Sequence, residues 1–203
     1  MSDLLDQTSP ADDAAGESTA RRLAGFGLTA LGGLLVGVGA LLPWIRSSVR
    51  GLPDELSPTY YGIDLPDGLV VLAGAAVMLG GLAITRLAAS PRTRRIGACA
   101  IVGAAFVTLV VAAVTTATAE SRFEPAAVDE ILAALDPSGT ATAAQRSQIE
   151  ASAETRLAAG SSVTMAGALL GMAGGLLVLS WAARGSVAPG ADGTPVTTSD
   201  PER

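Results

Sequence analysis

Four blocks without a single charged side chain constrain this chain more than any other feature. They cover residues 23–45, 68–85, 96–118 and 161–183. A bilayer core about 30 Å thick needs about 20 helical residues, so each block is long enough to cross it or nearly so. The sequence therefore predicts an all-α integral membrane protein, a bundle of four transmembrane helices that runs up, down, up and down.

The arginines between these blocks predict how the chain is oriented. All 13 basic residues are Arg, and seven of them flank the blocks on one side: Arg21, Arg22, Arg86, Arg92, Arg94, Arg95 and Arg184. Short loops that are rich in basic residues stay in the cytoplasm. We therefore expect a multi-pass protein of the plasma membrane whose N and C termini and 86–95 link are cytoplasmic.

The segments at the two ends and the first outer loop read as irregular. Residues 1–22 are acidic and residues 184–203 are rich in Gly, Pro and Thr, so both are predicted to be disordered cytoplasmic tails. Three prolines in the loop 46–67 favour a turn-rich path outside the membrane. We expect Trp44, Tyr60 and Tyr61 at the membrane interface, where amphipathic rings are enriched.

The second outer segment, residues 119–160, is too long for a bare connection, and its pattern predicts a helical hairpin. The first helix carries an apolar stripe at helical spacing: Val128, Ile131, Leu132 and Leu135. A second helix is expected to start near Thr140 or Thr142 and to run on toward the fourth span. The stripe either packs within the hairpin and the first loop or contacts a partner.

Groups that carry chemistry are scarce. The chain has no His and one cysteine, Cys99, so imidazole chemistry, an internal disulfide and a CxxC metal site are excluded. The spans hold no ionisable residue of the kind that marks intramembrane catalysis or proton relay. We expect no catalytic, cofactor-binding or metal site. The net charge of −6 also argues against nucleic acid as a partner.

The spans do carry small residues at regular spacing. In the first span Gly25, Gly33 and Gly37 recur in steps of four, with Thr29 between them, and in the fourth span Gly167, Gly171 and Gly175 do the same. Stripes of small residues let transmembrane helices approach closely. They either pack within one four-helix bundle or form an interface with another protein or a second copy.

Two short segments resemble a known type of protein. The segment GALLPWIRSS closes the first span, and YYGIDLPDG leads into the second. These segments resemble small four-helix membrane proteins that are common in actinobacteria, and the architecture is loosely similar to the tryptophan-biosynthesis-associated membrane proteins of that phylum. The resemblance covers about residues 30–85 and implies the four-span fold, but it implies no site residues.

These observations favour a non-enzymatic accessory or scaffold membrane protein. We expect it to sit in the lipid bilayer and to bind another membrane protein, or itself, through its small-residue helix faces and the outer hairpin. The alternative is a subunit of a small oligomeric transporter or channel. The sequence weighs against a pore for polar cargo, because the spans offer no charged lining residues.

Overall fold

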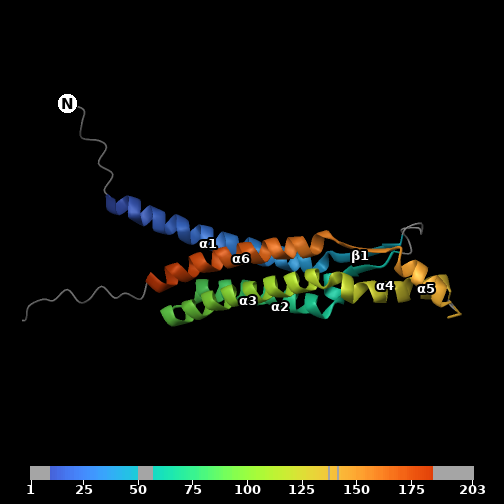
Figure 1. Cartoon of the computed structure of the whole chain (residues 1–203). Coiled ribbons are helices and arrows are strands. Elements are labelled where there is room, and N and C mark those ends of the chain that lie inside the picture. Colours follow the sequence, from blue (N-terminus) through green and yellow to red (C-terminus); the bar gives the residue numbers. More distant parts are fainter. Residues whose placement is uncertain (1–9, 50–56, 137, 141, 185–203) are drawn as a thin grey trace, which may run out of the picture.

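Four long helices form the body of the molecule in the computed structural model, which describes residues 10–49, 57–136, 138–140 and 142–184 (Figure 1). They are α1 (Pro10–Leu41), α2 (Pro66–Leu87), α3 (Pro91–Ala117) and α6 (Ala159–Arg184). Each contains a stretch that is long and apolar enough to cross a membrane: Thr19–Leu41, Pro66–Leu87, Pro91–Ala117 and Ala159–Ala183. The predicted four-span helical fold is therefore confirmed.

Local chemistry sets where these helices begin and end. Pro66 and Pro91 open α2 and α3, because a proline has no N–H to lose in the first helical turn. The hydroxyl of Ser90 accepts a hydrogen bond from the Thr93 N–H and caps α3. After α1 ends at Leu41, Pro43 prevents its continuation. The first span therefore ends four residues before the predicted Ile45.

The helices pack in a ring in which each contacts two antiparallel neighbours. α1 contacts α2 and α6, and α3 contacts α2 and α6. Buried positions alternate in steps of three and four along α3 at 98, 101, 105, 108, 112 and 115, and along α6 at 161, 164, 168, 171, 175, 178 and 182. That period of 3.5 residues is the signature of left-handed, coiled-coil-like packing with helix crossing angles near 20°.

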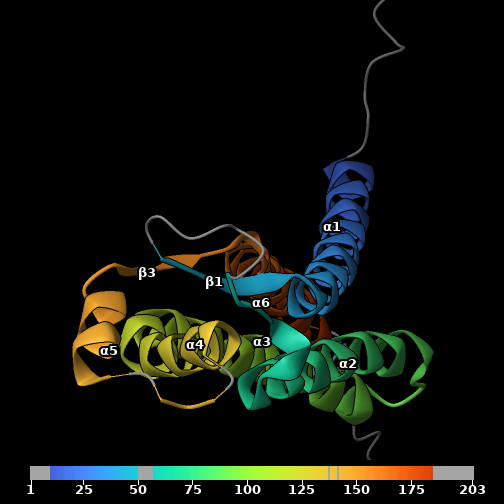
Figure 2. The ribbon, with the colours of Figure 1, turned by 90° about the vertical axis from the view of Figure 1, so that its right-hand side faces the viewer.

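A small mixed domain covers one end of the bundle, as Figures 1 and 2 show. It consists of the strands β1 (Pro43–Val49), β2 (Thr59–Tyr61) and β3 (Ala153–Leu157), with α4 (Ala119–Leu135), α5 (Ala143–Glu150) and a short 3-10 turn (Gly62–Asp64). The strands form an antiparallel sheet in the order β2-β1-β3. We call this part the sheet domain. The α2–α3 link lies at the opposite, arginine-rich end of the bundle.

The sheet corrects two predictions about the segments outside the spans. Part of the loop 46–67 is not irregular, because it supplies β2 and most of β1. The second helix of the hairpin exists but is short: α5 begins after Thr142, whose side chain forms a capping box with Gln145, and it ends at Glu150. The residues that follow form β3 instead of continuing the helix.

Two further predictions are changed. Residues 10–22 of the predicted N-terminal tail form the first turns of α1, whereas residues 1–9 and 185–203 lie outside the described part of the chain. Trp44 does not face the membrane interface. It is buried, with 1% of its surface exposed, and its indole N–H donates to the carbonyl of Gly39 at 2.8 Å. Its ring lies against Gly62 and Gly160, which have no side chains to obstruct it.

Candidate binding groove

The strand β1 presents two chemically different faces. Ile45, Ser47 and Val49 are buried on one face, while Arg46 is exposed on the other. This alternation follows from the two-residue period of a strand. The buried face lies against α4, and no helix that the structure describes covers the opposite face.

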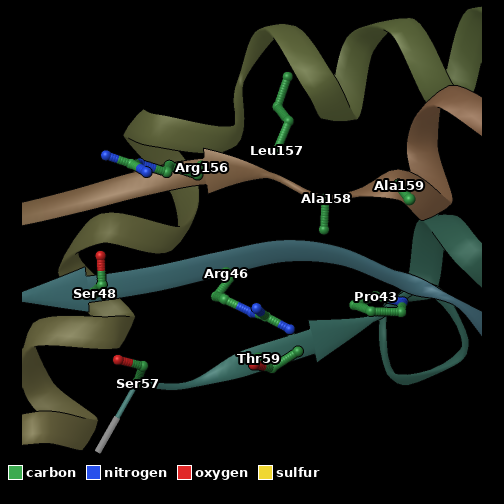
Figure 3. A pocket seen from close by; sticks show the side chains of 9 residues that line it. All are labelled: Pro43, Arg46, Ser48, Ser57, Thr59, Arg156, Leu157, Ala158 and Ala159. Carbon is green, nitrogen blue, oxygen red and sulfur yellow. The ribbon is translucent and has the colours of Figure 1, made fainter. Parts of the chain in front are cut away.

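The open face brings together two arginines that are 110 positions apart in the sequence. Arg46 on β1 and Arg156 on β3 are direct cross-strand partners, and Thr59 on β2 is the partner of Arg46 on its other side. They line a groove of about 760 Å³ together with Pro43, Ser48, Ser57, Leu157, Ala158 and Ala159 (Figure 3). None of these lining residues is a carboxylate.

The two guanidinium groups have different surroundings. Nη2 of Arg156 donates to both carboxylate oxygens of Glu154, at 3.0 and 3.1 Å, and these hydrogen bonds raise the pKa of Arg156. Arg46 makes no ion pair with any residue that the structure describes. Glu154 offsets the charge of Arg156, so among the described residues the net positive charge of the groove comes from Arg46. Hydroxyl groups lie beside this cation, which suits a carboxylate or another anion.

The covered face of the sheet explains where the apolar stripe of α4 lies. Val128 and Ile131 are buried, Leu132 is half-buried, and Leu135 is exposed at 46%. The half of the stripe nearer the bundle therefore packs within the chain.

Tyr60 adds a polar contact on the same side. Its ring lies 5.5 Å from that of Phe123, and its hydroxyl donates to Glu130 of α4 at 3.2 Å. Burial, and next the negative charge of Glu130, raise the pKa of Tyr60 to about 12.

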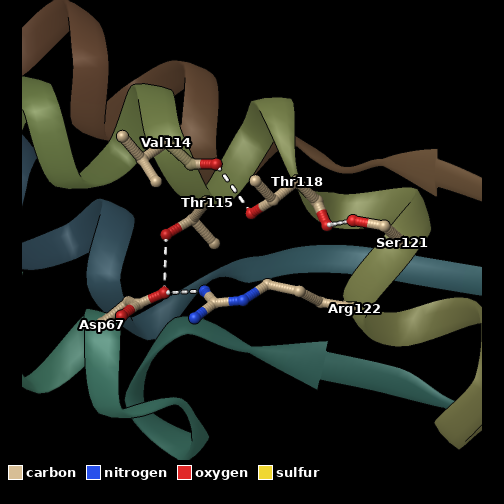
Figure 4. A network of polar contacts seen from close by, with 6 residues as sticks. All are labelled: Asp67, Val114, Thr115, Thr118, Ser121 and Arg122. Atoms are coloured by element: carbon tan, nitrogen blue, oxygen red, sulfur yellow. Dashed lines mark hydrogen bonds and ion pairs between the residues drawn. The ribbon is translucent and has the colours of Figure 1, made fainter.

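A polar network holds the sheet domain on the bundle (Figure 4). Asp67, in the first turn of α2, accepts a hydrogen bond from the Thr115 hydroxyl at 2.8 Å. The same carboxylate forms an ion pair with Arg122 of α4 at 2.9 Å. One carboxylate thus links α2, α3 and α4 at the point where the spans end. Because α4 also packs on β1 and β3, this link connects the sheet to the ends of the spans.

A second hollow, of about 670 Å³, lies between α4 and α5. Its basic residue, Arg146, is paired with Asp129 and with Glu150, so its charge is neutralised locally. The hollow therefore offers less to an anion than the groove does.

The glycines of both predicted stripes lie inside the bundle, but they contact different helices. Gly25 and Gly167 lie between α1 and α6, whereas Gly33 and Gly37 face α2. Gly171 faces Met78 of α2, and Gly175 faces side chains of α3.

The closest helix contact uses a different spacing, which the sequence analysis missed. Backbone meets backbone at Gly25, Gly32 and Gly39 of α1 and at Gly160, Gly167 and Gly174 of α6. Both series repeat every seven residues. A search for glycines at the heptad period would have found them, since that period is the one that left-handed packing requires.

The described residues contain no group of three or more His, Cys, Asp or Glu side chains that could hold a metal ion. The described residues that line the groove are two arginines, three residues with hydroxyl groups and four apolar residues.

Comparison with known proteins adds no assignment: no family model matches the chain, and no curated protein matches it. The resemblance of its first two spans to actinobacterial four-helix proteins therefore stays a prediction.

Proposed function

We propose that this chain is a non-enzymatic accessory membrane protein that binds an acidic segment of another membrane protein in the groove of its sheet domain. The observation that carries the proposal is the cross-strand pair Arg46 and Arg156 in a groove whose lining, among the residues that the structure describes, includes no carboxylate. Planar guanidinium groups recognise carboxylates through paired N–H donors, which gives geometric specificity as well as attraction.

The edge of the sheet supports an extended segment as the occupant. In the described part of the chain β3 pairs only with β1, so its other edge is free of strand partners. An unpaired edge offers backbone N–H and C=O groups to an incoming strand. A volume of about 760 Å³ suits a few residues of such a segment.

The bundle supports binding through the sheet domain in preference to the small-residue helix faces. The glycines of both predicted stripes already lie against other helices of the same chain. Large side chains such as Met78 and Ile101 are fully buried in the bundle. The charge-free blocks 23–45, 68–85, 96–118 and 161–183 make up the middle of the spans, so the alternative of a transporter or channel subunit has no charged pathway to support it.

The proposal also requires the groove to lie outside the cytoplasm. The clustered arginines of the α2–α3 link favour a cytoplasmic position for that end and for both termini. In a Cys99→Ala background, a cysteine at Ser48 should react with an impermeant thiol reagent in intact cells, and one at Ser90 should not. Labelling at Ser90 alone would invert the orientation.

A photo-crosslinking experiment in cells tests the binding itself. A benzoyl-phenylalanine at Ser48, inside the groove, should crosslink to an acidic segment of a second membrane protein. Charge reversal by Arg46→Glu with Arg156→Glu should abolish the product. Arg146→Glu, which changes an exposed cation of the same domain outside the groove, should leave it intact.

Two results would count against the proposal. A crosslink that survives the double charge reversal would show that the arginines do not recognise the partner. A product formed only with a second copy of this chain would favour the oligomeric alternative.

A further inference from the structure

The arginine-rich end of the bundle holds cations and aromatic rings in one cluster. Phe26 of α1 and Trp181 of α6 meet edge to face, with ring centroids 6.3 Å apart. The guanidinium carbon of Arg22 lies 5.9 Å from the Phe26 centroid and 5.0 Å from that of Trp181. Arg86 lies 5.2 Å from the Phe26 ring, and Arg94 lies 5.5 Å from that of Trp181. We call these five residues the arginine–aromatic cluster.

All four spans contribute to this cluster, so the bundle itself sets its geometry. α1 supplies Arg22 and Phe26, and α2, α3 and α6 supply one residue each. Arg94 is held further by a hydrogen bond from its Nε to the carbonyl of Ala88 at 2.8 Å. A guanidinium group has five N–H donors. An aromatic face attracts the group without using these donors. Most donors of the three groups thus stay available to an acceptor.

The positive charge of the cluster is not neutralised within the described part of the chain. Arg22, Arg86 and Arg94 make no ion pair there. The sequence has no Asp or Glu between residues 18 and 53 or between 68 and 119, the stretches from which these three arginines come. Like charges gathered around the same two rings repel one another, and an anion placed among them would relieve that repulsion.

We propose that the arginine–aromatic cluster binds the phosphate of an anionic phospholipid headgroup. The lipid source follows from what surrounds the cluster. Leu23, Leu87 and Ile96 are exposed at 57%, 86% and 61% at the same end of the spans. They provide the apolar surface that acyl chains require. Basic residues between transmembrane helices on the cytoplasmic side are suited to anionic headgroups, and Trp favours the headgroup level.

Fluorescence quenching in the full-length protein tests this proposal without altering an arginine. The chain has two tryptophans, and Trp44 is buried in the sheet domain at the other end of the bundle. In phosphatidylcholine nanodiscs, brominated phosphatidylglycerol should quench the protein more strongly than brominated phosphatidylcholine at the same mole fraction. Trp181→Phe should remove that difference. Equal quenching by the two lipids in the wild type would overturn the proposal.

A charge substitution supplies the second test. Arg22→Gln with Arg86→Gln should weaken phosphatidylglycerol binding by about 30-fold in a neutral detergent, measured by native mass spectrometry, because two juxtamembrane cations are lost. The matched control, Arg46→Gln with Arg156→Gln, removes the same charge at the other end and should leave the affinity unchanged. Equal loss in both variants would overturn the proposal, as would displacement of the lipid by an equal concentration of inorganic phosphate. The wild-type quenching decides the question if the double variant does not fold.

Discussion

Replacing Gly174 by alanine should force α1 and α6 apart. A Cβ at this position would lie 2.5 Å from the backbone nitrogen of Thr29 and 2.8 Å from the carbonyl oxygen of Gly25, whereas ordinary contact begins at 3.4 Å. Backbone atoms cannot swing aside, so the helices must separate by about 0.9 Å. A gap of that size forfeits a quarter to a half of the attraction between the facing atoms.

The expected cost combines two opposing effects. Overpacking a filled contact typically costs about 1–3 kcal/mol, and replacing a helical glycine by alanine returns up to about 1 kcal/mol of helix propensity. Because Gly27→Ala gains the same helix propensity without overpacking, we expect Gly174→Ala to be less stable than Gly27→Ala by about 1–3 kcal/mol. The same change at Gly27, where a Cβ would meet nothing within 4 Å, should be neutral or slightly stabilising.

Unfolding in mixed micelles of a mild detergent and SDS, followed by far-UV circular dichroism, measures both variants. The two curves should shift in different directions or by clearly different amounts. If Gly174→Ala and Gly27→Ala were equally stable, the close backbone contact between α1 and α6 would be refuted. The heptad glycines would then have no special part in packing.

Two further predictions concern the sheet domain. Ile131→Ala should lower the free energy of unfolding by about 2–5 kcal/mol, because the Ile131 side chain is only 2% exposed. Leu135→Ala, at an exposed position, should change it by only about 0.5 kcal/mol. Equal losses of stability in thermal melts would contradict the packing of α4 on the sheet. In a Tyr61→Phe background, the ultraviolet absorbance of Tyr60 should titrate near pH 12, and Glu130→Gln should lower that midpoint. Since folding raises this pKa above 10.0, its contribution to stability is complete below pH 10 and disappears as the pH rises toward 12.

The spans could be predicted because one signal is enough to specify them. A charge-free stretch of 18 or more residues has few alternatives to a transmembrane helix, whatever lies elsewhere in the chain. Their ends were less predictable. The first span was expected to reach Ile45 because Trp44 and Ile45 are apolar, but their apolar surface is buried in a strand and not in lipid.

The sheet could not be predicted because its pairing is non-local. The residues of β3, AETRL, favour a helix by local propensity, and they form a strand only because β1 lies beside them. Arg46 and Arg156 share a groove for the same reason, so neither carried a signal in the sequence. The prediction about the glycines was incomplete for a different reason. A glycine-rich span matches periods of four and of seven alike, and only the choice of neighbour separates them.

The heptad glycines connect the membrane bundle to the groove. β1 follows directly after α1, and β3 directly precedes α6. Helices usually pack with their axes about 8–10 Å apart, whereas paired strands lie about 4.8 Å apart. Strands that continue from two packed helices can therefore pair only if the helices come close together where they end. At that point Gly39 lies against the backbone of Thr164, and Gly160 lies against the carbonyls of Pro43 and Leu42. A side chain at either position would clash with this backbone and hold the two chain segments apart. The absence of side chains at Gly39 and Gly160 thus lets α1 and α6 end close together, and β1 and β3 continue from these ends with Arg46 and Arg156 on adjacent strands.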